Sequence, residues 1–388
     1  MDNLRGIQKA MKISWYSPKF GEREKQLVNK VLDDAYVNEG PMCKEVEKKL
    51  SEFLKVKNVI LTTSGSAAIF LALKADQVIR NLKDYEVIVP DFTCVASANA
   101  VRWAGAKEVL VDVNKDDYCI SIEDLAKKIT PKTKVILITQ IIGRCCNMEE
   151  LNKLAQKHGL VIIEDVAGAL GSKYKNDYLG TIGKAGCFSL QANKIISCGQ
   201  GGIVVTNDDE YANKIRRIRD QGRLNKSDLV YPIEGYNLKL NDILAAVVLG
   251  QLEDIENRIK NLIAQRKQYE KELSEVKEIY LPKTDYENGS VPLWIDPLAE
   301  NSEKLGKFLV ENGITIRKPG WPPVHRNGTY LCEDERFPNS TYISDNSLWV
   351  PNGPTIKPEE ITYICDKIKE FYKNNPGSSA QFNRPVCC

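Results

Sequence analysis

Short, wholly apolar segments that alternate with helix-like stretches are the feature that most constrains the fold of this chain. They read EVIVP, EVLVDV, KVILITQ and LVIIED, at residues 86–90, 108–113, 134–140 and 160–165. Helical patterns occur at 94–104 and 148–158. Strands that are apolar throughout are buried on both faces, which is typical of parallel sheets covered by helices. The sequence therefore predicts an α/β fold with a mainly parallel central sheet.

A further strand, turn and helix are predicted in NVILTTSGSAAIFLALKA, residues 58–75. Ser64, Gly65 and Ser66 fall at the N-terminus of this helix. Free backbone N–H groups and the helix dipole favour an anion such as phosphate at this position. The alternative is that Ser64 or Ser66 only caps the helix. Upstream, residues 21–56 predict two helices separated by a turn at Asn38–Pro41.

A lysine among small and apolar residues is the first chemical signal. In FSLQANKIISCGQGG (188–202), Ser189 precedes Lys194, and a glycine cluster and the apolar run IVVTN follow it. Confinement between a turn and a buried strand would desolvate the amine, lower its pKa and make it a nucleophile toward a carbonyl. The alternative is a surface lysine whose amine stays in water, which is the commoner situation for a lone lysine.

An acid at the end of a buried strand is the second signal. Asp165 follows LVIIE directly. Such an acid can hydrogen-bond to the nitrogen of a pyridine ring that acts as an electron sink. The carboxyl ends of parallel strands are where ligands bind, and both Asp165 and the Ser64–Ser66 turn fall there. The alternative is that Asp165 caps a helix formed by VAGALGS.

The C-terminal part of the chain is predicted to form a smaller α/β domain. Residues 237–273 carry apolar residues at helical spacing, and we expect one long helix that connects the two domains. Beyond it the patterns predict strands near 280–282, 292–297 and 315–317, a turn at 318–325, and helices near 302–312 and 358–372. We therefore divide the chain into a large domain (1–245), a small domain (246–375) and a tail without fixed structure (376–388).

Composition argues against several classes of function. The chain of 388 residues is 43% apolar with a formal charge of +2, which indicates no basic surface for nucleic acid or an anionic membrane. No apolar run of membrane-spanning length and no signal peptide are seen, so we expect a soluble cytoplasmic protein. The eleven cysteines contain no CxxC and there are only two histidines, so no metal site is predicted. Cys94, Cys187 and Cys198 are expected to be buried, reduced thiols.

Five motifs in a fixed order resemble those of one enzyme family. They read TSGSAAIFLAL, VPDFTCVASANAV, VIIEDVAGALGSKYK, FSLQANKIISCGQGG and GYNLKLNDILAAVVLGQLE. In this order they resemble the pyridoxal-phosphate (PLP) nucleotide-sugar aminotransferases of the DegT type, over roughly residues 14–372. The segments SKYKNDYLGTIG, RKPGWPPVH and YICDKIKEFY are most similar to the GDP-perosamine synthases of that family. The resemblance implies fold type I of the PLP-dependent transferases.

The resemblance also implies the roles of the residues at the cofactor. Lys194 would form the Schiff base with PLP and then carry the proton, and Asp165 would pair with the pyridinium nitrogen. The backbone N–H groups of Gly65 and Ser66, with the Ser189 hydroxyl, would hold the phosphate.

The same resemblance implies the substrates and the assembly. Asn237 would reach the phosphate of the neighbouring subunit's PLP, so the active site would be shared within a homodimer. Glutamate would donate the amino group, leaving pyridoxamine phosphate, and a nucleotide-linked 4-keto-6-deoxyhexose would accept it. In the turn at 318–325, Trp321 could stack on a sugar or base, and His325 could bind a hydroxyl or diphosphate. Packing between the domains is the alternative for Trp321.

The chain departs from the family pattern at four places. Gly168 stands where family members usually have Gln, Glu or His near the ring hydroxyl of PLP. Cys94 stands where an aromatic residue often stacks on the ring. The usual H-x-Y-G segment reads QIIG at 140–143, and Gln200 replaces the glutamate of GEGG. Lys194 is retained, which favours transamination over the related dehydratases that have histidine there.

Other functions remain open on the sequence alone. The departures could belong to a family member without catalysis, which binds PLP or a sugar nucleotide as a regulator or completes another chain's site. A PLP enzyme of another reaction type, such as dehydration or cyclitol transamination, is the third hypothesis.

Overall fold

A seven-stranded sheet lies at the centre of the computed structural model, which describes residues 12–224, 229–318 and 320–377. The strand order is β1-β9-β8-β5-β4-β2-β3. Every neighbouring pair is parallel except those that involve β9, which runs antiparallel to both β1 and β8. The strands are β1 (Asn58–Thr62), β2 (Glu86–Pro90), β3 (Lys107–Val111), β4 (Thr133–Thr139), β5 (Val161–Asp165), β8 (Ala185–Ser189) and β9 (Gly202–Thr206).

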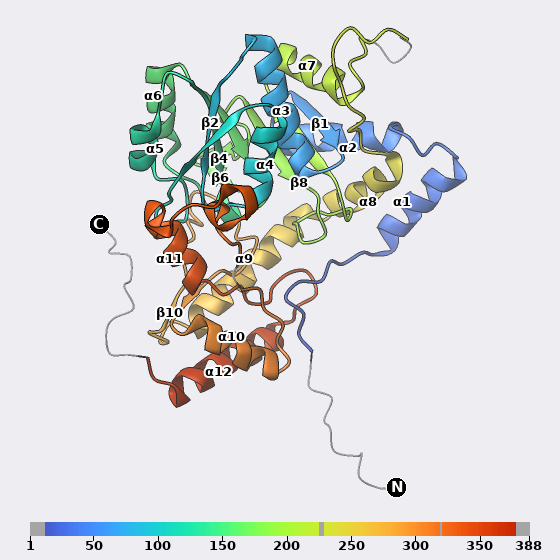
Figure 1. Cartoon of the computed structure of the whole chain (residues 1–388). Coiled ribbons are helices and arrows are strands. Elements are labelled where there is room, and N and C mark those ends of the chain that lie inside the picture. The colour runs from blue at the N-terminus through green and yellow to red at the C-terminus, as the bar shows by residue number, and fades with distance from the viewer. Residues whose placement is uncertain (1–11, 225–228, 319, 378–388) are drawn as a thin grey trace.

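Helices cover both faces of this sheet, as the apolar strands predict (Figure 1). Successive strand residues alternate between two buried clusters: Ile88 packs on one face, and Val87 and Val89 pack on the other. One cluster includes α3 (Gly65–Arg80), α4 (Val95–Trp103) and α7 (Asp209–Arg219). The other includes α1 (Glu22–Asp33), α2 (Pro41–Leu54), α5 (Ile122–Lys128), α6 (Met148–His158) and α8 (Asp242–Leu252).

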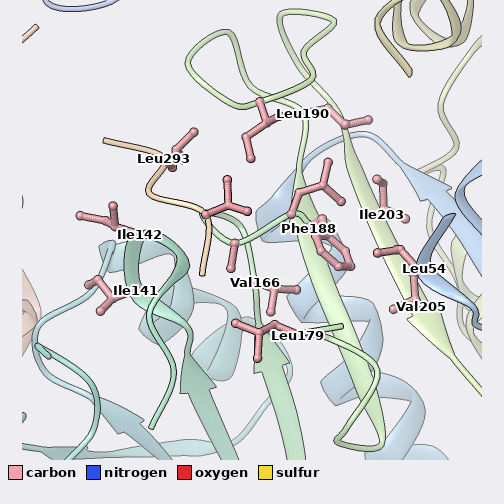
Figure 2. Packing of buried hydrophobic residues seen from close by; sticks show 14 of the residues in the cluster. Leu54, Ile141, Ile142, Val166, Leu179, Phe188, Leu190, Ile203, Val205 and Leu293 are labelled. Carbon is pink, nitrogen blue, oxygen red and sulfur yellow. The ribbon is translucent and has the colours of Figure 1, made fainter. Parts of the chain in front are cut away.

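Figure 2 shows part of the second of these clusters, beside the ends of β8 and β9. Phe188 projects from β8, and Ile203 and Val205 project from β9 into the same apolar region. All three are fully buried, with at most 1% of their surface exposed. This packing fixes the two strands that flank the loop carrying Lys194, and so fixes the position of that loop.

A separate buried cluster forms the core of the C-terminal part. It joins the end of α9 (Ile255–Glu272) to α10 (Ser302–Glu311) and α12 (Pro358–Asn374), at the bottom of Figure 1. Ile13, from the N-terminal segment, also packs there. The remaining elements are short: β6 (Lys173–Tyr174), β7 (Asp177–Tyr178), β10 (Ile279–Tyr280), β11 (Leu298–Ala299), α11 (Pro338–Asn346) and 3-10 turns at Ile141–Gly143, Val324–Arg326, Gly328–Tyr330 and Asp334–Arg336.

The prediction of one long helix at 237–273 is wrong, because two helices occupy this stretch. Asn241 accepts a hydrogen bond from the backbone N–H of Leu244 and so caps the N-terminus of α8. An asparagine at this point of NLKLND is a typical sign that a helix begins there. The chain then turns at 253–254, where Glu253 pairs with Arg23. The turn lets α8 stay buried in the sheet-side core while α9 leads to the second core.

The domain boundary predicted after Ala245 falls inside α8. Ala245 precedes the predicted boundary and Ala246 follows it, yet both residues pack in the buried cluster that contains α1, α2 and α8. Within α9, Leu262 packs in that cluster and Tyr269 packs in the C-terminal core. We therefore propose a boundary within α9. Of the predicted tail, residues 378–388 lie outside the described residues.

The other predicted elements of the small domain are only partly regular. The strands expected at 292–297 and 315–317 are single bridges, Ile295 with Val350 and Arg317 with Trp349. Helices α5, α7 and α11 and the β6–β7 hairpin were not among the predicted elements. Within the described ranges, the structure has no helix that combines the length and apolar character needed to cross a membrane.

Candidate active site

A cavity of about 620 Å³ opens at the carboxyl ends of β4, β5 and β8. Its wall also includes the N-termini of α3 and α4 and residues from the C-terminal part of the chain. The structure brings most of the predicted site residues to this wall: Gly65, Ser66, Cys94, Asp165, Gly168, Ser189, Lys194 and Trp321. Parallel strands end at the same edge of the sheet, which is why residues that follow different strands meet at this cavity.

Lys194 lies in the loop between β8 and β9 and is 9% exposed. Burial lowers the pKa of its amine to about 8, although the negative charge of Asp165 opposes this shift. The Nζ atom lies 4.6 Å from the centre of the Trp294 ring. The Tyr16 hydroxyl donates to the main-chain carbonyl of Lys194 at 3.0 Å, which ties the loop to the N-terminal segment. The surface-lysine alternative is therefore wrong.

Asp165 ends β5 with its carboxylate buried beside the cavity. It accepts hydrogen bonds from the Ser97 hydroxyl at 2.6 Å and from the backbone N–H of Ala167 at 3.1 Å. Burial raises the pKa of this carboxyl, and the two hydrogen bonds and the charge of Lys194 lower it in part. The predicted helix after Asp165 is absent, since residues 166–172 form turns, so the helix-cap alternative is wrong.

The N-terminus of α3 forms the opposite end of the candidate cofactor site. Ser64 caps the helix by accepting from the N–H of Ala67 at 3.1 Å, as the capping alternative predicts. Gly65 and Ser66 occupy the first turn, where backbone N–H groups have no acceptor within a helix. Gly65 approaches β8 so closely that a Cβ atom there would lie 2.9 Å from the Ser189 Cβ. The backbone N–H groups of the first turn of α3 therefore lie beside the Ser189 hydroxyl.

Gly168 lies against Ile142, which stands where the family's H-x-Y-G segment has its tyrosine. A Cβ added at Gly168 would lie 3.5 Å from the backbone N of Ile142 and 3.7 Å from Leu293. Ile142 itself adopts a left-handed backbone with φ of 54°, which is rare for a β-branched residue. A methyl group fits at residue 168, whereas a longer side chain would need space that Ile142 and Leu293 line.

Cys94 corrects one prediction. It is exposed rather than buried, because it stands before α4 on the cavity wall. Cys187 and Cys198 are buried free thiols, as expected. Gln200 also lines the cavity.

Trp321 both packs and lines the cavity. Its ring meets those of Trp294 and Trp349 edge-on, with centroid distances of 5.6 and 5.0 Å. Trp15 lies 5.9 Å from Trp294 in the same group. The aromatic group therefore fixes Trp321 in place while it remains part of the cavity wall.

His325 does not lie on the cavity, which corrects its assignment to the substrate site. Its side chain is fully buried, and both ring nitrogens lie near carboxylates: Nδ1 is 2.6 Å from Asp91 and Nε2 is 2.9 Å from Asp334. The backbone N–H of His325 also donates to Asp91. These contacts fasten the Pro-rich segment to the end of β2 and leave no ring nitrogen for a ligand.

Asn237 also lies away from this cavity. It is exposed and forms an isolated bridge with Asp220 in the segment that leads to α8. Its predicted role concerns the cofactor of a second subunit, so a position outside its own cavity is compatible with that role.

Four residues near the cavity were missed by the sequence argument: Tyr16, Ser97, Trp294 and Arg317. Ser97 lies in the predicted helix after β2, where nothing marks its hydroxyl as facing an acid. Arg317 lies in a predicted strand. The one sign in the sequence that it could reach the site is its position just before the turn at 318–325, which contains Trp321.

The buried amine of Lys194 should destabilise the cofactor-free protein. In the folded chain its pKa is about 8 against 10.5 for an ordinary lysine, a difference worth roughly 3 kcal/mol. We expect Lys194→Met to unfold at a higher urea concentration than the wild type below about pH 8. Between about pH 8 and 10.5 the unfolded wild type holds a proton that the folded form has released, so the free energy of unfolding of the wild type rises with pH. The difference in unfolding free energy between the variant and the wild type therefore shrinks over this range. A difference independent of pH in urea titrations would contradict this.

Comparisons with known proteins show the family to which this chain belongs. Residues 18–369 match the DegT/DnrJ/EryC1/StrS aminotransferase family. The GDP-perosamine synthase of Escherichia coli O157:H7 is 32% identical over 361 residues, which cover 92% of this chain and 98% of that protein. The GDP-perosamine synthase of Vibrio cholerae is 31% identical over 367 residues, with coverage of 92% and 98%.

Solved structures show the same fold. A DegT DnrJ EryC1 StrS aminotransferase from Brucella abortus is 27% identical, with a TM-score of 0.84 and coverage of 90% of this chain and 95% of that one. DesV of S. venezuelae, solved in complex with a ketimine intermediate, is 26% identical, with a TM-score of 0.87 and coverage of 93% and 98%. This chain therefore belongs to the DegT/DnrJ/EryC1/StrS aminotransferase family.

Proposed function

We propose that this chain is a PLP-dependent sugar aminotransferase that moves an amino group from glutamate to a nucleotide-linked 4-keto-6-deoxyhexose. The observation that carries the proposal is the presence of Lys194 and Asp165 on one cavity wall. One supplies a buried amine with a pKa near 8, and the other a buried carboxylate. This pairing of nucleophile and acid suits a cofactor with an aldehyde and a ring nitrogen.

The residues present fit PLP. The first turn of α3, with Ser66 and Ser189, offers hydrogen-bond donors for a phosphate, and the helix dipole favours its charge. Asp165 has two hydrogen-bond donors in the described chain, Ser97 and Ala167, and its raised pKa shows that burial leaves its charge incompletely compensated. A protonated ring nitrogen would supply the missing positive charge.

When bound, PLP supplies the electron sink that makes a proton on the substrate's reacting carbon removable. Lys194 then acts as the base. An amine whose pKa is near 8 can both accept and release a proton near neutral pH. Asp165 keeps the ring nitrogen protonated. The Trp294 ring, 4.6 Å from the amine, and the tie from Tyr16 hold Lys194 in place and restrict water around it.

The finer substrate assignment is a proposal supported by the relatives. GDP-perosamine synthases from two organisms cover nearly the whole chain at 31–32% identity. We propose a 4-keto-6-deoxyhexose linked to a nucleoside diphosphate, GDP in the first instance, as the amino acceptor. Trp321 is the aromatic side chain on the wall that we assign to the sugar or base. The intact Lys194 and Asp165 favour this enzyme over a non-catalytic regulator.

We further propose that the enzyme works as a homodimer. The segment around Asn237 lies outside its own cavity, and nearby Leu229, Val230 and Tyr231 are exposed, with Leu229 at 88%. Large apolar side chains gathered in one exposed segment are typical of a protein interface. In the dimer Asn237 would reach the partner's cofactor phosphate.

A substrate screen tests the function. The purified holoenzyme is incubated with glutamate and 4-keto-6-deoxyhexoses linked to GDP, UDP or dTDP, and the products are read by mass spectrometry. We expect one nucleotide sugar to gain an amino group while glutamate becomes 2-oxoglutarate. Binding of PLP without conversion of any amino donor would contradict the proposal and favour the regulatory hypothesis.

Replacing Trp321 by alanine should separate its binding role from its packing role. We expect the KM for the nucleotide sugar to rise by about 10-fold or more, because a stacking face of roughly 1–3 kcal/mol is lost, while the KM for glutamate changes far less. Steady-state kinetics with each substrate varied in turn measure this. Equal rises in both KM values would show that Trp321 only packs against Trp294 and Trp349.

A further inference from the structure

His325 is a buried titratable side chain for which the proposed reaction has no direct use. Its Nδ1 atom lies 2.6 Å from a carboxylate oxygen of Asp91, and its Nε2 atom lies 2.9 Å from one of Asp334. Carboxylate oxygens accept hydrogen bonds, so both ring nitrogens donate, Nδ1 to Asp91 and Nε2 to Asp334. The ring of Phe337 stacks on the imidazole at a centroid distance of 4.9 Å. These contacts fix the imidazole in one orientation.

The two carboxylate partners of this ring differ in burial. Asp91 is fully buried, whereas the side chain of Asp334 is 45% exposed and also accepts hydrogen bonds from Arg326. Burial raises the pKa of Asp91, and the hydrogen bonds from His325 oppose that shift. A buried carboxylate depends on its few donors, while an exposed one can replace a lost donor by water. The contact between His325 and Asp91 is therefore the one that the local structure depends on.

Asp91 joins two parts of the cavity wall. Its main-chain carbonyl accepts a hydrogen bond from the backbone N–H of Thr93 at 3.1 Å and another from that of Val324 at 2.8 Å. Its carboxylate accepts from the backbone N–H of His325 at 2.8 Å, in addition to the imidazole. Thr93 lies on the wall of the cavity, and so does Trp321, which precedes Val324 by three residues. The contact between His325 and Asp91 therefore sets how these two segments of the wall lie relative to each other.

Trp321 is coupled to His325 because the segment between them is stiff. Residues 322 and 323 are both prolines, whose rings fix the backbone angle φ. The Trp321 ring also meets that of Phe92, the residue after Asp91, edge-on with centroids 6.3 Å apart. A displacement at the contact between His325 and Asp91 therefore moves the indole that the proposed function assigns to the sugar or base.

We propose that His325 positions Trp321 for the nucleotide sugar by donating a hydrogen bond from Nδ1 to Asp91. His325 is not on the cavity wall, so it is a positioning residue that acts through Trp321. This inference rests on the proposed function, in which Trp321 contacts the amino acceptor. It requires the affinity for the nucleotide sugar to depend on His325, and the affinity for glutamate to be independent of it.

Two substitutions separate the roles of the two ring nitrogens. In His325→Asn the amide nitrogen takes the place of Nδ1 and keeps a donor to Asp91, whereas in His325→Gln it takes the place of Nε2 and that donor is lost. His158→Gln changes an exposed histidine at the end of α6 and serves as the matched control.

Calorimetry measures the binding of the amino acceptor without turnover, because the PLP form has no amino group to transfer. The ligand is a 4-keto-6-deoxyhexose linked to GDP, or to the nucleotide that the substrate screen selects. We expect its Kd to rise about 10-fold in His325→Gln, since the stacking face of Trp321 is displaced. The Kd should change by no more than about 2-fold in His158→Gln. His325→Asn should stay clearly closer to the wild type than to His325→Gln.

A double-mutant cycle tests whether His325 acts through Trp321. The cycle compares Trp321→Ala, His325→Gln and the variant that carries both changes. Once the indole is gone its positioning no longer matters, so the double variant should bind the nucleotide sugar as weakly as Trp321→Ala alone. Effects that multiply in the double variant would show independent action and overturn the proposal.

The half-reaction with glutamate distinguishes positioning from general support of the fold. Its rate is followed by the spectral change of the bound cofactor, and the KM for glutamate in His325→Gln should equal that of the wild type. An equal loss of affinity for both substrates would overturn the proposal. If thermal unfolding shows that His325→Gln does not fold, His325→Asn decides the test: a Kd for the nucleotide sugar near the wild-type value supports the role of Nδ1, and a rise of about 10-fold overturns it.

The outcomes for the two proposals are distinguishable. If the wild type converts the nucleotide sugar and His325→Gln binds it equally well, the role of His325 is wrong and the proposed function stands. If the wild type neither binds nor converts any nucleotide sugar, the proposed function fails, and the role of His325 fails with it.

Discussion

Lys194→Ala is expected to lower the rate of transamination by about four orders of magnitude or more, to the background of the assay. The substitution removes both the group that bonds the cofactor aldehyde and the base that moves the substrate proton, and each contributes separately to the rate. Stopped-flow measurement of each half-reaction quantifies the loss. Added methylamine should restore little activity, since a free amine lacks the fixed position that the loop between β8 and β9 gives to Lys194.

The matched control is Lys107→Ala, because Lys107 is an exposed lysine on β3 that is not part of the cavity wall. It should keep the wild-type rate. Thermal unfolding of the Lys194 variant should show an intact fold. A Lys194→Ala enzyme that keeps a tenth of the wild-type rate would rule out its role as the nucleophile.

Asp165→Asn is the substitution with the second largest expected effect. The variant keeps the size of the side chain and loses the charge that holds the ring nitrogen protonated, so the cofactor would withdraw electrons less strongly. We expect kcat to fall on the order of 10²- to 10³-fold, as for the loss of one well-placed electrostatic group in other enzymes. The absorption spectrum of the bound cofactor should change as well, which a purely structural role for Asp165 would not produce.

Ser97→Ala is the matched control for Asp165→Asn. It removes the 2.6 Å hydrogen bond to the carboxylate but keeps the negative charge. We expect a rate loss of roughly 10-fold or less, together with a higher pKa of Asp165, since one stabilising donor is gone. If Ser97→Ala impaired the enzyme as strongly as Asp165→Asn, the charge of Asp165 would not be the decisive feature.

Local sequence patterns were sufficient to predict the central sheet and the chemical core of the site. The strand predicted at 86–90 coincides with β2, and the helix predicted at 148–158 coincides with α6. Lys194 and Asp165 were recognised because their neighbours along the chain are apolar and small, so burial could be inferred from adjacent residues. Burial and strand direction then placed both side chains at one edge of the sheet.

Contacts between distant residues were not predictable from such patterns. The Tyr16 hydroxyl meets the Lys194 carbonyl across 178 positions, and Arg317 reaches the cavity from the C-terminal part of the chain. His325 was misassigned because its partner Asp91 lies 234 positions away, and without that partner a histidine beside a tryptophan resembles a ligand-binding residue. Cys94 was expected to be buried, because its apolar neighbours do not reveal that the start of the helix predicted at 94–104 lies on the wall of a cavity.

Borohydride reduction of the purified holoenzyme, followed by peptide mapping, tests the central claim most directly. Reduction makes the bond between cofactor and lysine permanent, so the modified peptide carries the added mass of the cofactor. We expect this mass on the peptide that contains Lys194, with loss of activity in step with labelling. Labelling of a different lysine, or full activity after complete reduction, would contradict it.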